Sequence, residues 1–173
     1  LLADSREPYQ EAERLAGQVP LGSDGAMAFL GPGPVSMARA GLRTGGLIFG
    51  TPLSFQEVSR GQLFRAFMEN LAYGVKANLE AVEAAAGERA RVIHLGGGMS
   101  RSRTLTRVLA DVLGREVAVS ALPQVSTLGA AMAASVASGL YKDLKEAARA
   151  MAPQHHVVEP DPVGAAEYRD LYE

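Results

Sequence analysis

Residues 91–119, RVIHLGGGMSRSRTLTRVLADVLGREVAV, decide how the rest of the chain is arranged. This segment predicts a buried strand over residues 92–95, a turn of three glycines, a helix that ends at Gly114 and a second strand from Val117. The helix is predicted because its apolar residues recur at spacings of three and four. The order of the elements indicates an α/β domain in which this helix packs on a sheet.

The turn Gly96-Gly97-Gly98 is the strongest signal for a ligand in the chain. Glycine has no Cβ and tolerates unusual backbone angles, so a ligand can come close to the backbone of such a turn. The helix start that follows offers N–H groups without helical partners, and these groups favour an anion. A nucleotide is therefore the ligand that we expect here.

Two better-known glycine motifs do not fit this turn. A dinucleotide fingerprint that starts at Gly96 would need a sixth-position glycine, where the chain has Arg101. The Gly-Lys-Ser/Thr ending of a phosphate-binding P-loop does not occur in the sequence. Local chemistry alone thus leaves two alternatives, a nucleotide site and a structural turn without a ligand.

Composition and charge exclude several classes of function. The 173 residues are enough for one sizeable core, and a net charge of -2 provides no basic surface for a nucleic acid. The absence of cysteine excludes disulfides and thiol nucleophiles and fits a reducing compartment. The longest apolar run, residues 128–140, is interrupted by polar residues and is too short for a membrane span. We expect a soluble, cytoplasmic protein without a signal segment.

The first part of the chain predicts one short helix and then a loop-rich segment. The helix should begin near Pro8 and stop at Gly17, with Tyr9 and Leu15 among its buried contacts. Frequent glycines between residues 19 and 50 indicate loops with one or two short strands, at residues 27–30 and 47–49. This segment is either functional or a surface excursion.

A long core helix is predicted from Ser59 to Gly87. Ser59 and Gln62 have the spacing of a capping box, and a second box starts at Ser54. Arg65 and Glu69 lie one turn apart on this helix, and we interpret them as a solvated ion pair. The apolar positions that define the helix are Phe64, Phe67, Met68, Leu71, Val75, Leu79 and Val82.

The remaining segments predict four helices. In the helix after the glycine turn, Asp111 is interpreted as a helix-face or capping partner rather than a catalytic acid. Ser126 and Thr127 should cap the next helix, which contains many small residues. A short helix follows Asp143, and a terminal helix follows residues 160–162. The apolar stripe of the first of these helices consists of Leu105, Val108, Leu109 and Val112.

Neither the histidines nor the serines point to catalysis. His94, His155 and His156 lack the spacing and the acidic neighbours of a metal site, and His94 is interpreted as a structural residue of a strand. No serine lies in a nucleophile elbow of the G-x-S-x-G kind, so a hydrolase is not indicated.

Four blocks in a fixed order carry a resemblance to a known family. They are LFRAFMEN on the long helix, LGGGMSRS at the turn, LADVLG at the end of the next helix and STLGAAMAASVASGLY beyond the second strand. In this combination the chain resembles the C-terminal domain of the FGGY family of carbohydrate kinases, from about Leu1 through Tyr172. The LFRAFMEN block is closer to the autoinducer-2 kinase-like branch.

The resemblance implies a helix-rich, actin-like α/β domain with a ribonuclease-H-like core. Residues 1–173 would be the C-terminal, nucleotide-binding domain of a two-domain kinase that transfers the γ-phosphoryl group of ATP to a sugar or polyol, with Mg²⁺ as cofactor. The N-terminal domain and the start of this domain would precede Leu1. The oligomeric state stays open, with a homodimer among the options.

The resemblance also implies which residues contact the nucleotide. Gly97, Gly98 and Met99 would lie against adenine and ribose, with Ser102 near the purine. Gly96 and Ser100 would support the turn. In the STLGAA block, Gly129, Ala130 and Ala131 would let two interdomain helices pack closely.

The chain departs from the family at several positions. It has Leu105 and Arg107 where the family commonly carries tryptophan and glutamine, and residues 31–43 lack the usual Gly-Glu-Arg-x-Pro loop. The catalytic aspartate and both phosphate loops would precede Leu1, so no catalytic residue is predicted in this chain. An alternative function is a stand-alone actin-like module that binds nucleotide or assembles without catalysis.

Overall fold

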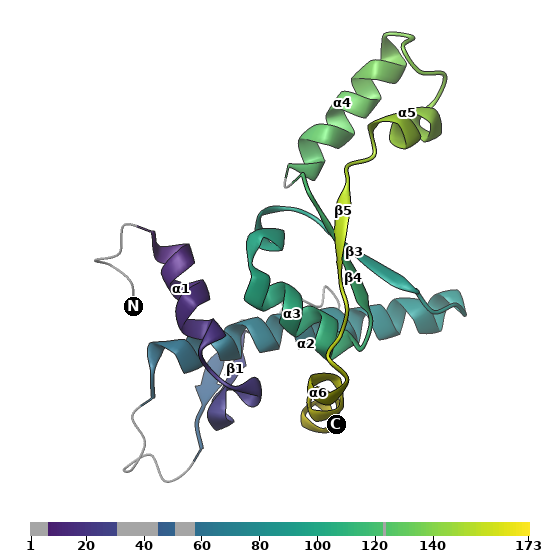
Figure 1. The fold of residues 1–173 in the computed structure, drawn as a ribbon. Coiled ribbons are helices and arrows are strands. Elements are labelled where there is room, and N and C mark those ends of the chain that lie inside the picture. Colours follow the sequence, from purple (N-terminus) through teal and green to yellow (C-terminus); the bar gives the residue numbers. More distant parts are fainter. Residues whose placement is uncertain (1–6, 31–44, 51–57, 123) are drawn as a thin grey trace.

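The computed structural model describes residues 7–30, 45–50, 58–122 and 124–173 (Figure 1). The loop at residues 31–43 and the capping box predicted at Ser54 lie outside these residues. Within the described part of the chain, no helix combines the length and the apolar character that a membrane crossing requires.

A three-stranded sheet is built around the segment with the glycine turn. Strand β3 (Val92–Leu95) runs parallel to β4 (Glu116–Ser120), and helix α3 (Arg103–Leu113) connects them. Strand β5 (His155–Val158) lies antiparallel on the other side of β4. The predicted strand, turn, helix and strand are thus present, but the burial expected of residues 92–95 was wrong, because β3 lies at the edge of the described sheet with Val92 and His94 exposed. Strand β5 was not predicted.

Helix α3 forms the centre of the core. It begins after Ser102, whose side chain caps the helix, and it ends at Gly114, which has a left-handed conformation with a φ of 60°. The helix contacts α1, α2, α6 and the sheet, so its polar residues Thr106 and Asp111 are buried together with its apolar stripe. Both side chains are hydrogen-bonded. The Thr106 hydroxyl donates to the Ser102 carbonyl at 2.7 Å, and the Asp111 carboxylate accepts from the backbone N–H of Asp161.

The long helix α2 (Arg60–Ala86) lies across the molecule beside α3 (Figure 1). The predicted capping box is present, and Gly87 ends the helix with a φ of 71°. The core prediction was only partly right, because Val75 is 40% exposed and Val82 is 64% exposed. The fully buried positions of α2 are instead Gly61, Ala66, Glu69 and Ala72.

Helix α1 (Pro8–Gly17) packs on the start of α2. A Cβ at Gly61 would lie 2.7 Å from the Leu15 carbonyl oxygen, so the missing side chain allows this close approach. The predicted helix is confirmed, and Leu15 is half-buried, but Tyr9 is 90% exposed and the expectation that it is buried was wrong. Ala16 is the one residue of α1 that is buried.

The glycine-rich segment contains a short 3-10 helix and two short strands. Helix η1 (Leu21–Gly25) is followed by β1 (Met27–Phe29), which pairs antiparallel with β2 (Gly46–Ile48). Both predicted short strands are therefore present. Residues 22–25 all have positive φ, including the non-glycine residues Ser23 at 53° and Asp24 at 52°. This backbone conformation is unfavourable for residues with a Cβ, so other contacts must hold it.

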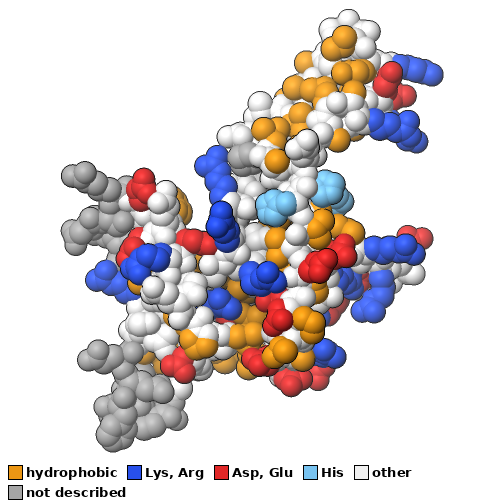
Figure 2. Space-filling model, in the orientation of Figure 1, with side chains coloured by type: hydrophobic (Ala, Val, Ile, Leu, Met, Phe, Trp, Pro, Cys, Tyr) orange, Lys and Arg blue, Asp and Glu red, His pale blue; other side chains and the backbone are white. Residues whose placement is uncertain are grey.

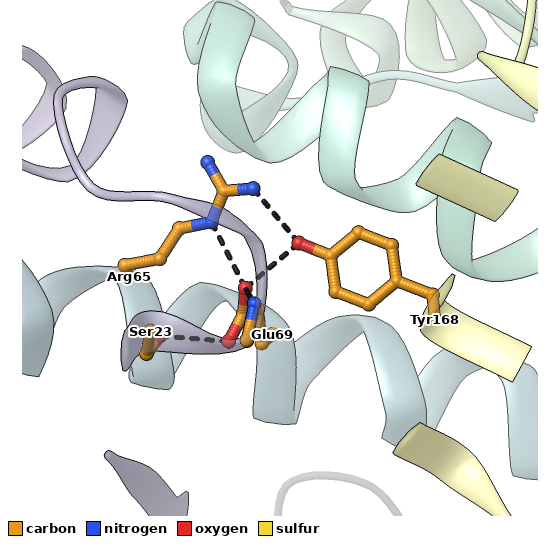
Figure 3. A network of polar contacts seen from close by, with 5 residues as sticks. Ser23, Arg65, Glu69 and Tyr168 are labelled. Carbon is orange, nitrogen blue, oxygen red and sulfur yellow. Dashed lines mark hydrogen bonds and ion pairs between the residues drawn. The ribbon is translucent and has the colours of Figure 1, made fainter. Parts of the chain in front are cut away.

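Those contacts come from Glu69, which is buried at the centre of a polar network (Figure 3). The backbone N–H of Gly22 and the hydroxyl of Ser23 donate to its two carboxylate oxygens at 3.0 and 2.7 Å. The Tyr168 hydroxyl donates to it at 2.7 Å, and Arg65 Nε donates at 3.0 Å. The Arg65 and Glu69 side chains are only 11% and 5% exposed, so the predicted solvated pair is wrong.

The C-terminal helix α6 (Pro162–Tyr172) closes this network and covers α3. Tyr168 is 1% exposed, and burial followed by the nearby Glu69 charge raises the pKa of its hydroxyl. At the other end of α6, Asp111 accepts a hydrogen bond of 2.7 Å from the backbone N–H of Asp161. The interpretation of Asp111 as a capping partner is confirmed, and burial raises the pKa of its carboxyl group.

Helices α4 (Val125–Ala137) and α5 (Leu144–Met151) pack on each other and project from the rest of the molecule (Figure 1). Asp143 caps α5 as predicted. Helix α4 begins after Gln124, two residues before the cap predicted at Ser126 and Thr127, and has no side-chain cap, so that prediction was wrong. No residue of α4 is buried, and apolar side chains cover much of the projecting pair (Figure 2).

We predict that replacing Glu69 by alanine lowers the free energy of unfolding by about 3–5 kcal/mol, because Arg65 would be left buried without its partner. Tyr168→Phe should cost less, about 1.5–3 kcal/mol, because one hydroxyl that bonds charged groups is lost. Urea unfolding at pH 7 measures both changes. Tyr172→Phe is the matched control, since the Tyr172 hydroxyl makes only an exposed bond to Glu80. Equal effects of the two tyrosine variants would contradict this account.

An ion pair between Glu83 on α2 and Arg115, just before β4, fixes the start of the three-stranded sheet. Arg115 Nη2 donates to Glu83 Oε2 at 2.9 Å, and the backbone N–H of Ala90 donates to the same carboxylate at 2.7 Å. Arg115 Nη1 also donates to the Ala90 carbonyl at 3.0 Å. The hydrogen bond from Arg115 lowers the pKa of Glu83 from 4.5 to about 2.

We predict that the contribution of Glu83 to stability depends on pH. Because its folded-state pKa is lowered, the contribution is complete above about pH 4.5 and is lost as the pH falls toward about 2. Glu83→Gln should therefore destabilise the protein at pH 7, and the difference from wild type should shrink at pH 3. Urea midpoints at both pH values measure this, with Glu88→Gln as an exposed control. A pH-independent difference would exclude the linkage.

Candidate nucleotide site

The three glycines of the turn between β3 and α3 serve different purposes. A Cβ at Gly96 would lie 2.8 Å from Cγ1 of Val125, so this glycine lets the start of α4 come close. Gly97 has a φ of 96° and a ψ of −175°, a conformation that only glycine adopts readily. Gly98 does not have positive φ, and a Cβ there would meet no atom within 4 Å.

Gly98 is therefore the one glycine of the three that the fold of this chain does not require. Open space in front of a backbone without a side chain is what a closely approaching ligand needs. Met99, the next residue, has an apolar side chain that is 54% exposed. Gly98 and Met99 carry no charge, which suits an aromatic base better than a phosphate.

The turn itself is held by its own hydrogen bonds. Residues Gly98–Arg101 form a short 3-10 helix, η4. The Ser100 hydroxyl donates to the Gly97 carbonyl at 2.7 Å, and the Ser100 backbone N–H donates to the same oxygen at 3.2 Å. Ser100 thus faces back into the turn rather than outward.

Ser102 joins the turn to α3 and also to α1. Its hydroxyl oxygen accepts from the Leu105 backbone N–H at 3.0 Å, and its hydroxyl donates to Oε2 of Glu13. The other oxygen of Glu13 accepts from the Thr104 backbone N–H at 2.7 Å. Sequence reasoning missed Glu13, which lies 89 residues from Ser102 in the chain and has no recognisable spacing to it.

These bonds correct one expectation about the site. The start of α3 was expected to offer unpaired N–H groups to an anion, but those of Thr104 and Leu105 already have acceptors within the chain. The Glu13 carboxylate also places negative charge there. A phosphate group would be repelled by that charge, so the start of α3 suits the uncharged end of a nucleotide.

The two positions at which α3 departs from the family pattern do not reach the turn. Leu105 is 3% exposed and belongs to the core. Arg107 points to the segment before α6, where its Nη1 donates to the Glu159 carbonyl at 2.7 Å. Arg107 therefore ties α3 to the C-terminal helix, and neither residue is part of the candidate site.

The described residues include no group of three or more histidine, cysteine, aspartate or glutamate side chains that could hold a metal ion. His94 lies exposed on β3, and its ring meets the edge of the His155 ring on β5 with centroids 6.0 Å apart. This contact crosses the sheet, so the interpretation of His94 as a structural strand residue fits its position.

The class of protein follows from comparison of the sequence with known families. Residues 25–138 match the profile of the FGGY family of carbohydrate kinases, C-terminal domain. The chain belongs to this family, as the four sequence blocks predicted.

Similar proteins agree with this assignment. The autoinducer-2 kinase of Salmonella paratyphi A is 27% identical over 167 residues, which are 96% of this chain and 31% of that protein. A ribulokinase of Halalkalibacterium halodurans is 34% identical over 117 residues, 65% of this chain and 21% of the relative. The chain thus spans about a third of the length of the autoinducer-2 kinases that it matches.

A solved structure confirms the predicted actin-like α/β fold of the family. The xylulose kinase of Rhodospirillum rubrum superposes with a TM-score of 0.73 at 27% identity, and the match covers 98% of this chain and 33% of that one. The predicted fold class, a helix-rich α/β domain, therefore holds for the described residues, whose sheets are small.

We predict that alanine substitutions separate the roles of the three glycines. Gly97→Ala should lower the free energy of unfolding by about 1–3 kcal/mol because of its backbone angles. Gly98→Ala should be neutral or stabilising by up to about 1 kcal/mol, since alanine restricts the unfolded chain and meets no neighbour. Urea unfolding of the 173-residue chain measures these changes.

Gly96→Ala provides an internal control, because its cost should come from the contact with Val125. Combining it with Val125→Ala should recover part of the lost stability. A Gly98→Ala variant that is as unstable as Gly97→Ala would show that Gly98 is needed for folding.

Proposed function

We propose that this chain is the nucleotide-binding, C-terminal part of a carbohydrate kinase that transfers the γ-phosphoryl group of ATP to a hydroxyl of a sugar or polyol. The observation that carries the proposal is the turn at Gly98, where the chain leaves out a side chain that its own fold would accommodate. Membership of the FGGY family supplies the class of reaction.

In this proposal the base and ribose of ATP lie against Gly97, Gly98 and Met99. Ser102 faces the purine, while Gly96 and Ser100 hold the turn. The uncharged surface of Gly98 and Met99 and the negative charge of Glu13 both support this orientation, because the polyphosphate would extend away from the start of α3. ATP supplies the phosphoryl group, and these residues bind and orient its other end.

We assign no catalytic base and no Mg²⁺ ligand to this chain. The described residues provide no cluster of three or more carboxylate or other ligand side chains that could hold a metal ion. Phosphoryl transfer requires magnesium, phosphate contacts and a residue that orients the attacking hydroxyl. In the proposed kinase those functions belong to an upstream domain, in line with relatives three times as long as this chain.

The projecting pair α4–α5 supports a two-domain arrangement. Gly129, Ala130 and Ala131 are exposed on α4, and their small side chains would let a helix of the other domain approach closely. Residues 1–173 would then be one domain of a cytoplasmic enzyme. Relatives that align over nearly the whole chain are autoinducer-2 kinases, so autoinducer-2 itself belongs in the substrate panel beside ribulose and glycerol.

We predict that Gly98→Val in the full-length protein weakens ATP binding at least tenfold, because the added side chain occupies the space of the base. Gly46→Val is the matched control, since Gly46 also has open space around it and lies in β2. Isothermal titration with ADP gives the affinities, and a coupled assay of ADP release over the substrate panel gives the activity.

Three results of this experiment bear on the proposal. Loss of binding in Gly98→Val alone supports it. Unchanged affinity would mean that the turn is structural. ADP binding without ATP consumption on any sugar, polyol or related substrate would favour the stand-alone module instead.

A further inference from the structure

The hydroxyl of Ser102 has its hydrogen-bonding direction fixed by the fold. A serine hydroxyl has one proton to donate and two lone pairs to accept with. The Leu105 N–H can only donate, so it takes one lone pair of Ser102. A carboxylate can only accept, so the hydroxyl proton of Ser102 points to Glu13.

One hydrogen-bonding position of Ser102 then remains, and it is a lone pair. Ser102 is half-buried, between the turn that ends at Arg101 and the first turn of α3. Its hydroxyl cannot rotate to donate to a ligand without breaking the bond to Glu13. Glu13 is itself held in place, because its other oxygen accepts from the Thr104 N–H at 2.7 Å.

We propose that Glu13 is a specificity-determining residue that makes Ser102 a pure hydrogen-bond acceptor, so that the site selects a purine with an amino group at C6 over one with a carbonyl oxygen there. The inference rests on the proposed function, in which Ser102 faces the purine. An amino group donates to the free lone pair of Ser102. A carbonyl oxygen at the same position would meet another acceptor, and both would lose a partner.

The charge of Glu13 acts in the same direction. Its carboxylate lies next to Ser102 and attracts the partially positive amino hydrogens of adenine, whereas it repels the oxygen of hypoxanthine. Glu13 is thus a positioning residue: it acts on the ligand through the hydroxyl of Ser102.

The test compares ADP with inosine 5′-diphosphate, which carries an oxygen in place of the amino group at C6. Equilibrium binding of each diphosphate to the full-length protein is measured for wild type and for Glu13→Gln. Wild type should bind ADP about tenfold more tightly. In Glu13→Gln, the amide oxygen can accept from Thr104 while the amide NH₂ donates to Ser102, so the hydroxyl proton turns toward the ligand. The preference for ADP should then disappear or reverse.

Two further variants make the result interpretable. Glu11 lies on the same helix as Glu13 but contacts Arg14 instead of Ser102. The Glu11→Gln variant should therefore keep the wild-type preference for ADP. Ser102→Ala removes the hydroxyl and should abolish the preference even if Glu13→Gln does not fold. The affinity ratio is informative because a general loss of stability would weaken both diphosphates alike.

Equal binding of the two diphosphates by wild type would overturn this inference and leave the proposed function intact. An unchanged preference in Glu13→Gln would overturn it as well. Failure of the full-length protein to bind either diphosphate would contradict the proposed function, and this inference with it.

Discussion

The structure depends on one buried carboxylate, that of Glu69. It lies on α2 and accepts hydrogen bonds from η1 at Gly22 and Ser23 and from α6 at Tyr168, with Arg65 as its counter-charge. Three separate elements of the fold would otherwise have to bury these polar groups unpaired. Because a buried ionised group is costly without partners, the network makes one arrangement of α2, η1 and α6 strongly preferred.

That arrangement determines where the candidate site lies. Helix α3 packs between α2 and α6, so its position follows from theirs. The glycine turn is the N-terminal extension of α3, and Glu13 on α1 fixes the first turn of the helix through Ser102 and Thr104. The backbone of the turn is thereby attached to the core at one end and to β3 at the other. A site of this kind can hold the base of a nucleotide without rearrangement.

Local patterns in the sequence predicted most elements, because helical spacing, caps and glycine stops act within a few residues. The capping box at Ser59, the stop at Gly87 and the strand before Gly96 are of this kind. Burial of Glu69 could not be predicted, since an Arg65–Glu69 pair looks the same on a solvated helix and its partners Ser23 and Tyr168 lie 46 and 99 residues away. Likewise β5 and Glu13 acquire their roles only through contacts between distant segments. In the site, sequence identified the turn, but only the structure distinguished Gly98 from Gly96 and Gly97.

In the proposed kinase, the turn receives the base end of a nucleotide while the phosphates lie away from α3. A crystal structure of the full-length protein with ADP tests this most directly. We expect the adenine ring to lie against Gly98 and Met99, with its amino group at the Ser102 hydroxyl and Glu13 still bound to Thr104. A phosphate at the start of α3 in place of the Glu13 carboxylate, or a nucleotide bound elsewhere, would contradict it.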